Sequence, residues 1–224
     1  MSFLAGQNGL YDGDYQYHDA YFDNQSYAFN TAVSYQMTPE ISLTALTGTL
    51  TEDEALLGMN GQGALAIDNS NTYYAGLMLA WQPTPQWSFS GAYYNGWTKP
   101  TKADNSLLST SKLLSNSFAF DGHYNFNQTD LVGFQISSPL RIYAGTAFFD
   151  IATGRDNYSD AIYREIVRAS LKPSSREYKF AFYHNQQLRK SIVFKSELAM
   201  RLNPDHQADA PTDYRAMLGL SWDF

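Results

Sequence analysis

Among the residues of this sequence that could carry chemistry, we first consider an aspartate and a histidine two positions apart, Asp121 and His123. A carboxylate can orient an imidazole so that it acts as a general base, and the couple could therefore be half of a hydrolytic site. The sequence identifies no activated serine to complete such a site. We therefore expect His123 to be a hydrogen-bonding residue, and we assign no catalytic residue from the sequence.

The three other histidines are His18, His184 and His206, and no two histidines have the His-x-x-x-His spacing of a zinc site. Cysteine is absent, which excludes a thiolate metal site, a disulfide framework and a cysteine nucleophile. The glycine-rich stretch 58–63 lacks the Lys-Ser/Thr ending of a phosphate-binding loop. We expect no metal and no cofactor. His206 is expected to pack within a loop, and the acidic run 51–54 is expected to be a solvated loop.

A second set of candidate residues consists of charges in the last third of the chain, each on the polar side of an alternating segment. On a soluble β-sandwich such charges would face water. In a closed barrel they would face the lumen, where opposite charges on neighbouring strands pair. We favour the second arrangement, and the predicted lumen charge network consists of Arg164, Arg168, Lys179, Lys195, Glu197, Arg201 and Arg215.

The elements that must position these residues are β-strands, because apolar and polar residues alternate with a period of two. Residues 27–37 place Tyr, Phe, Val and Met at alternate positions, and residues 214–224 repeat the pattern. No segment has the pattern of an amphipathic helix. The predicted strands lie near 26–37, 41–50, 72–82, 87–96, 116–126, 131–137, 140–151, 162–171, 177–185, 191–202 and 213–224, and 14–22 is a further candidate.

Two fold classes produce this alternation. A β-sandwich buries its apolar face, whereas an outer-membrane barrel turns that face to lipid. Strands of about 9–12 residues suit a tilted crossing of a bilayer, and aromatic residues at the strand ends are typical of the two girdles of a barrel. We therefore predict an all-β protein, an up-and-down antiparallel transmembrane β-barrel of about 12 strands. The barrel would occupy 25–224, and 1–24 would be a linker, a lumen segment or an irregular first strand.

The predicted connections alternate in length. Short turns are expected at 38–40, 83–86 and 127–130, and long loops at 51–71, 97–115 and 203–212. This rhythm is typical of a barrel with short turns at one rim and long loops at the other. It fails in the middle of the chain, because 137–140 is short where a long loop is due and 153–161 is long where a short turn is due.

Composition excludes several other classes. The net charge is -7, and without a dense run of Lys and Arg a nucleic-acid partner is not expected. No apolar run reaches the roughly 18 residues of a transmembrane helix. The first residues lack the basic and apolar regions of a signal peptide, so an export signal would have to lie upstream.

The chain ends on Trp222, Asp223 and Phe224. In hydrocarbon every backbone polar group needs a partner, so a sheet must close on itself and the last strand would pair with the first. Phe224, with Trp222, is similar to the C-terminal aromatic signal read by the bacterial barrel-assembly machinery. Both termini are then expected in the periplasm, with the long loops facing outward.

Three stretches resemble the C-terminal region of subtilisin-like autotransporter serine peptidases of Gram-negative bacteria. They are SSPLRI (137–142), LKPSSRE (171–177) and RLNPDHQADAPTDYRAMLGL (201–220), and the resemblance covers residues 131–224. Ser175 and Asp205 stand where the family pattern has Gly.

The resemblance implies a barrel of about twelve strands in the bacterial outer membrane that anchors an N-terminal passenger and assists its translocation. Its partners would be outer-membrane lipid, lipopolysaccharide, the assembly machinery and the covalently linked passenger. The Gly-Thr-Ser-Met and His-Gly motifs of a subtilisin are absent, so no protease activity is expected of this chain. Three alternatives stay open: a free-standing pore whose basic lumen favours anions, a barrel hydrolase acting at the outer surface, and a soluble β-sandwich binding module.

Overall fold

The computed structural model describes residues 2–8, 26–60, 62–127, 129–189 and 191–222. These residues form β-strands and their connections, with two short 3-10 turns, η1 (Gly63–Leu65) and η2 (Pro204–His206). The prediction of an all-β protein is confirmed. No helix in the described part of the chain is long and apolar enough to cross a membrane.

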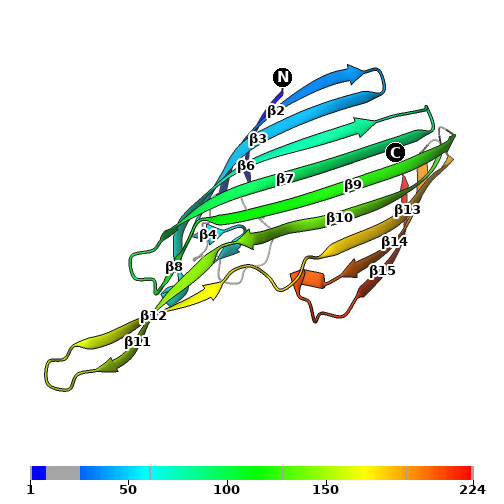
Figure 1. Cartoon of the computed structure of the whole chain (residues 1–224). Helices are drawn as coiled ribbons and strands as arrows, with labels where there is room; N and C mark the ends of the chain where they lie inside the picture. The colour runs from blue at the N-terminus through cyan, green and yellow to red at the C-terminus, as the bar shows by residue number, and fades with distance from the viewer. Residues whose placement is uncertain (1, 9–25, 61, 128, 190, 223–224) are drawn as a thin grey trace.

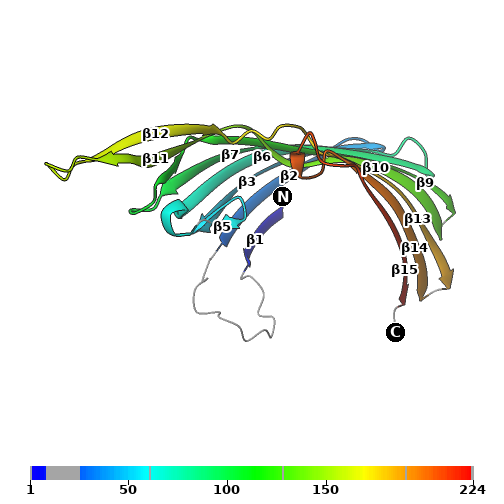
Figure 2. The ribbon, with the colours of Figure 1, turned by 90° about the horizontal axis from the view of Figure 1, so that it is seen from below.

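Ten strands form one antiparallel sheet in which every strand pairs with its neighbours in the order β1-β2-β3-β6-β7-β9-β10-β13-β14-β15. The sheet is strongly arched, so that it has a convex and a concave face (Figure 2). Its two edges are β1 and β15, which are not paired with each other in the described residues, so the sheet is open. The strands are β1 (Ser2–Asn8), β2 (Ser26–Thr38), β3 (Ile41–Asp53), β6 (Ile67–Trp81), β7 (Trp87–Lys102), β9 (Leu113–Asn127), β10 (Asp130–Ala144), β13 (Tyr178–Arg189), β14 (Ile192–Leu202) and β15 (Asp213–Trp222).

The alternation of short and long connections is confirmed. Short turns join β2 to β3, β6 to β7, β9 to β10 and β13 to β14, and we call this side of the sheet the short-turn edge. At the opposite side, the long-loop edge, 54–66 and 103–112 carry the small strands β4 (Ala55–Leu56), β5 (Met59–Asn60) and β8 (Leu108–Thr110).

The failure of the rhythm in the middle of the chain has a structural explanation. The predicted turn at 137–140 does not exist, because β10 continues through it to Ala144. Pairing of β10 with β9 shifts register between Ser138 and Arg141, which leaves Pro139 unpaired. A bulge tolerates proline because the missing N–H is not required there. Among the described residues the main sheet therefore contains ten strands, where about twelve were predicted for the barrel.

The two remaining predicted strands leave the main sheet. β11 (Thr146–Arg155) and β12 (Ile162–Ser170) form a hairpin that pairs with β8 in a separate three-stranded sheet and projects beyond the long-loop edge (Figure 1). The long stretch 153–161 includes the tip of this hairpin. The hairpin is thus an elaboration of one long connection, between β10 and β13.

The described residues form a small cluster of buried apolar side chains near the long-loop edge. Leu56, Ile67 and Leu113 are buried there, and partly buried leucines and one isoleucine surround them. The predicted solvated loop at 51–54 is wrong in part, because Glu52 is buried next to this cluster. Its carboxylate accepts hydrogen bonds from the backbone N–H groups of Leu57 (2.8 Å) and Gly58 (2.7 Å). These bonds give the buried carboxylate hydrogen-bond partners and hold the start of the loop against β3.

Candidate functional site

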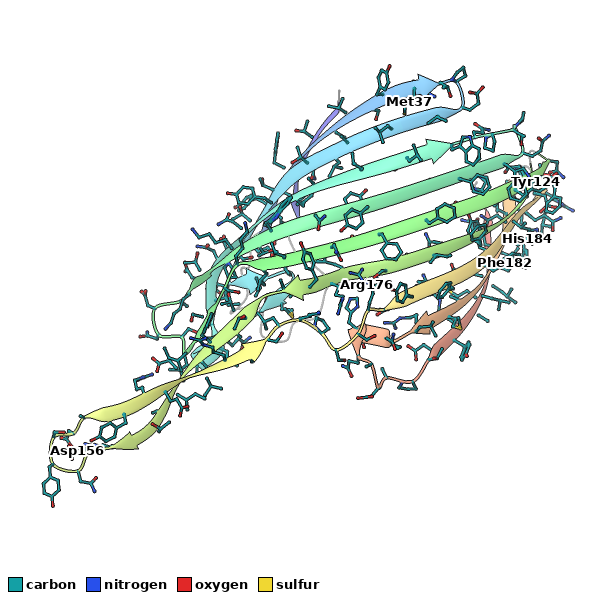
Figure 3. All side chains as sticks on the ribbon, in the orientation of Figure 1. Met37, Tyr124, Asp156, Arg176, Phe182 and His184 are labelled. Atoms are coloured by element: carbon teal, nitrogen blue, oxygen red, sulfur yellow. The ribbon has the colours of Figure 1, made fainter. Side chains whose placement is uncertain are left out.

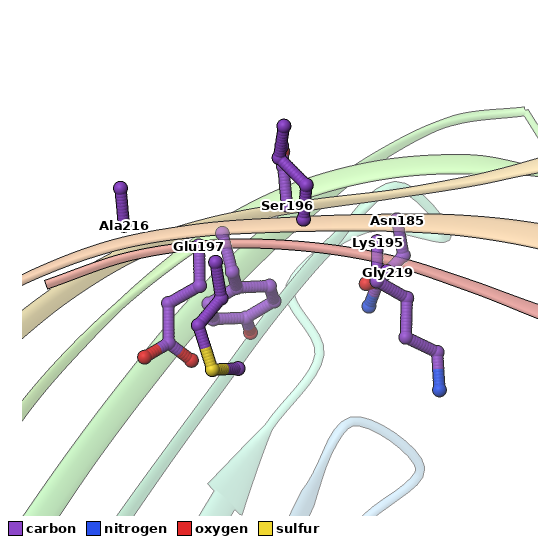
Figure 4. Close-up of a pocket in the computed structure, with 9 residues that line it drawn as sticks. Asn185, Lys195, Ser196, Glu197, Ala216 and Gly219 are labelled. Carbon is purple, nitrogen blue, oxygen red and sulfur yellow. The ribbon is translucent and has the colours of Figure 1, made fainter.

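The two faces of the sheet differ in chemistry, and neighbouring residues of β14 show how they are divided. Lys195 and Glu197 project from one side of the strand, whereas Ser196 projects from the other (Figure 4). The first side faces the concave interior, where the remaining strands of the arch lie. Because directly paired residues of adjacent strands share a face, the register extends this assignment across the sheet.

The convex face is mostly apolar and aromatic from β2 to β15, and many of its large apolar side chains are exposed. Leu218 is 78% exposed, Leu198 64% and Phe182 55%. Figure 3 views the sheet from its convex side, with Phe182 and Tyr124 labelled. The exposed large apolar side chains that the register assigns to this face are Tyr27, Phe29, Val33, Tyr35, Tyr73, Leu77, Leu79, Trp81, Trp87, Tyr93, Trp97, Phe120, Phe134, Phe182, Leu198, Tyr214, Leu218 and Leu220.

One polar pair interrupts the convex face close to the short-turn edge. Nε2 of His184 lies 2.6 Å from Oδ1 of Asp130, and the ring of Phe194 stands edge-on to the imidazole. The pair links β10 to β13, and the imidazole and the carboxylate each have the other as a hydrogen-bond partner. A structural role therefore accounts for both residues. His18 lies outside the described residues.

The concave face carries five of the seven charges predicted for a lumen network. Lys179, Lys195, Glu197, Arg201 and Arg215 come from β13, β14 and β15, and the register places them on this one face. Arg215 donates from Nη2 to Oε1 of Glu197 at 2.7 Å across two adjacent strands. Lys195 and Glu197 also line a hollow of about 590 Å³ on the same wall (Figure 4).

The other two predicted members are not brought to this face. Arg164 and Arg168 lie on β12, in the separate three-stranded sheet. Arg164 donates from Nε to Asp150 at 2.8 Å, and Arg168 lies over the ring of Phe148. The difference from the sequence prediction arises because β12 has the alternation of a barrel strand but pairs only with β11.

A carboxylate that the sequence prediction missed anchors the charge network at the long-loop edge. Glu177 is 6% exposed, and Arg201 donates to both of its oxygens, at 2.8 and 3.1 Å. These hydrogen bonds from Arg201 lower the pKa of Glu177 below its ordinary value, against the opposing effect of burial. Arg201 also contacts Asp205 and Asp213, each at 3.2 Å.

His206 ties the same loop to the sheet. Its Nδ1 accepts the backbone N–H of Glu177 at 2.8 Å, and its Nε2 lies 2.9 Å from the carbonyl oxygen of Leu140. Since Nδ1 accepts, the ring must be the neutral tautomer that donates from Nε2. The predicted role of His206 in loop packing is confirmed.

The Asp121–His123 couple belongs to a polar row that crosses the concave face. Nδ1 of His123 lies 3.2 Å from Oδ1 of Asp121, and the hydroxyl of Tyr183 donates to Oδ2 of Asp121 at 2.7 Å. Tyr183 is on β13 and Asp121 on β9, so the phenol crosses the intervening strand β10 at Gly133. A Cβ at Gly133 would overlap the Tyr183 ring, so only glycine allows this crossing.

The same arrangement of a tyrosine ring over a glycine recurs on this face. Tyr94 lies over Gly76, and Tyr74 lies over Gly48. Sequence alternation identified Asp121 and His123 but not Tyr183, because the hydrogen bond joins residues 62 positions apart.

The remaining predicted site residues lie at the C-terminus. Trp222 is the last residue of β15 and pairs with Ile192, and Phe224 lies outside the described residues. Within the described residues no group of three or more His, Asp or Glu side chains could hold a metal ion.

Comparison with models of known protein families finds no match for this chain, and comparison with curated protein sequences finds none either.

Proposed function

We propose that this chain is an outer-membrane β-barrel that anchors an N-terminal passenger and assists its translocation. The observation that carries the membrane part of the proposal is the distribution of side chains over the two faces. Leu198, Leu218 and Phe182 stand exposed on the convex face, while Lys195 and Arg215 are on the concave face. Water would make such an outer surface unfavourable, whereas acyl chains would solvate it.

The open edges support closure into a barrel in the membrane. Unpaired N–H and C=O groups along β1 and β15 would be costly in hydrocarbon, and pairing the two edges would satisfy them. Closure would give ten strands, an even number as in bacterial single-chain barrels. From β2 to β15, the strands of the main sheet are 10–16 residues long, which is enough for a tilted strand to cross a bilayer.

The passenger part of the proposal rests on the resemblance of 131–224 to autotransporter barrels. The short-turn edge would face the periplasm and the long-loop edge the exterior, and the partners would be lipid, lipopolysaccharide, the assembly machinery and the linked passenger. The chain's own residues lack subtilisin motifs, so any protease activity would belong to the passenger. A reporter domain fused upstream of the full chain should become accessible to external protease in intact Gram-negative cells.

Two adjacent residues of β14 test the membrane assignment directly. The chain has no cysteine, so Ser196→Cys and Lys195→Cys each introduce one labelling site, on opposite faces of the sheet. Each variant is labelled with a polarity-sensitive fluorophore and folded into phospholipid vesicles. We expect brominated lipids to quench the label at 196 and iodide in water to quench the label at 195. The reverse pattern, or failure of both variants to enter vesicles, would refute the proposal.

A free-standing pore would share the same faces and differ in conductance. Planar-bilayer recording of the folded chain distinguishes the two, because steady anion-selective current is expected of an open pore and not of an anchor whose lumen is filled. This measurement is independent of the vesicle experiment.

A further inference from the structure

We propose that Ser88, His123 and Asp121 form a hydrolytic site on the concave face near the short-turn edge, with Ser88 as the nucleophile toward small carboxylic esters. This activity would be separate from the proposed anchoring function and unrelated to the subtilisin motifs that the chain lacks. It also differs from the expectation drawn from the sequence, in which no serine was identified to complete the couple.

The orientation of His123 is the first part of the argument. Asp121 is held from two directions, because Tyr183 donates to Oδ2 at 2.7 Å and His123 contacts Oδ1 through Nδ1 at 3.2 Å. The carboxylate therefore directs Nδ1 of the imidazole, and Nε2 has no hydrogen-bond partner among the described residues. A base of this kind needs one ring nitrogen held by a carboxylate and the other free to accept a proton.

The position of Ser88 is the second part. Ser88 on β7 is the direct cross-strand partner of His123 on β9. Directly paired residues of adjacent antiparallel strands have Cβ atoms about 4.5–5.5 Å apart and point to the same face. The described structure shows no hydrogen bond between the Ser88 hydroxyl and His123, so the proposal requires the hydroxyl to turn about the Cα–Cβ bond toward Nε2. The backbone thus places nucleophile, base and orienting carboxylate on two adjacent strands.

A cavity in front of these residues is the third part. Its volume is about 390 Å³, within the usual range for small-molecule sites, and both Ser88 and His123 line it. Gln36, Glu40, Ser42 and Gln82 line it as well, together with the apolar residues Pro39, Ala80, Trp81 and Phe89, so its lining is part polar and part apolar. A cavity of this size with a mixed lining can hold a short acyl ester.

The reaction would proceed through an acyl-enzyme. The Ser88 hydroxyl oxygen attacks the ester carbonyl carbon while its proton passes to Nε2 of His123, and Asp121 stabilises the resulting imidazolium. The C–O bond to the alcohol breaks, and the alcohol leaves with the proton from Nε2. Water then attacks the acyl-serine, giving its proton to Nε2, and the serine oxygen recovers a proton as the carboxylic acid leaves.

Labelling with a fluorophosphonate, together with hydrolysis of p-nitrophenyl butyrate, tests the proposal in the full chain folded in detergent. We expect the probe to modify Ser88, identified by peptide mass spectrometry. Ser88→Ala and His123→Ala should abolish labelling and turnover, and Asp121→Asn should lower turnover by about 10³- to 10⁴-fold. Ser117 also lies on β9 but does not line the cavity, so Ser117→Ala is the matched control. This variant should be labelled and should hydrolyse the ester as the wild type does.

Heat-modifiable migration in gel electrophoresis shows for each variant whether the sheet has folded. A folded wild-type protein that the probe does not label would overturn the proposal, as would labelling that persists unchanged in Ser88→Ala. Tyr183→Phe provides a second test, because it removes the hydrogen bond that positions the Asp121 carboxylate. It should reduce turnover less than Asp121→Asn does and change the pH profile, which a purely structural role would not do. A negative result leaves the membrane assignment intact, because that assignment depends on the convex face.

Discussion

Replacing Gly133 by alanine should disturb the polar row on the concave face. The new Cβ would overlap the ring of Tyr183, and the phenol would have to leave its position over β10. Forcing an extra methyl group into such a contact costs about 1–3 kcal/mol. The displaced hydroxyl would also lose its 2.7 Å hydrogen bond to the carboxylate of Asp121, and a hydrogen bond to a charged group contributes about 1.5–3 kcal/mol.

An opposing effect must be subtracted. Gly→Ala lowers the entropy of the unfolded chain and stabilises the folded state by about 0.4–1 kcal/mol where the backbone allows it. The net loss expected for Gly133→Ala is therefore about 1.5–5.5 kcal/mol. Gly219 on β15 is the matched control, since a Cβ there has no neighbour within 4 Å. Gly219→Ala should leave the free energy of unfolding unchanged or raise it by up to about 1 kcal/mol.

Urea titration in phospholipid vesicles, followed by tryptophan fluorescence, measures these free energies. A double-mutant cycle with Tyr183→Ala isolates the contact between ring and glycine. If the ring causes the loss, Gly133→Ala should cost little once the ring is absent, and the coupling energy should approach the sum of the steric and hydrogen-bond contributions, about 2.5–6 kcal/mol. Two additive substitutions, or equal effects of Gly133→Ala and Gly219→Ala, would refute the reasoning.

The remaining predictions concern the two faces and the long-loop edge. Leu198→Arg should destabilise the protein in vesicles by about 2–4 kcal/mol, because it places a charge on the lipid-facing side. Lys195→Arg on the other face should change the free energy of unfolding by less than about 0.5 kcal/mol. Similar small effects of the two substitutions would contradict a lipid-facing convex surface. Because hydrogen bonds from Arg201 lower the pKa of Glu177, that pair should stabilise the fold fully above the ordinary glutamate pKa of 4.5 and lose its contribution as the pH falls through the lower folded-state value. Glu177→Gln should flatten the measured dependence of unfolding free energy on pH in this acidic range, and an unchanged slope would contradict the assignment. His206→Ala removes two hydrogen bonds worth about 0.5–1.5 kcal/mol each, so hydrogen exchange should accelerate in 203–212 while amides of β2 keep their protection.

Much of the secondary structure could be predicted from local sequence. Alternation with a period of two identified the strands that became β2, β3, β6, β7, β9, β13, β14 and β15, because successive side chains of a strand point to opposite faces. It also sorted Lys195 and Arg215 from Leu198 and Leu218, since a face is a property of position along one strand. The turn prediction at 137–140 was wrong, because proline marks a turn in most sequences and a bulge in this one.

The sequence by itself determined which residues are strand-forming and which pairs of side chains share a side of each strand. Tertiary structure decided which strands pair, and therefore that β11 and β12 leave the main sheet and take Arg164 and Arg168 with them. It also decided that Tyr183 meets Asp121 across Gly133, a contact between three strands that no local pattern encodes. The physical reason is that alternation is a property of a single strand, whereas pairing and the curvature of the sheet depend on contacts between residues far apart in the chain.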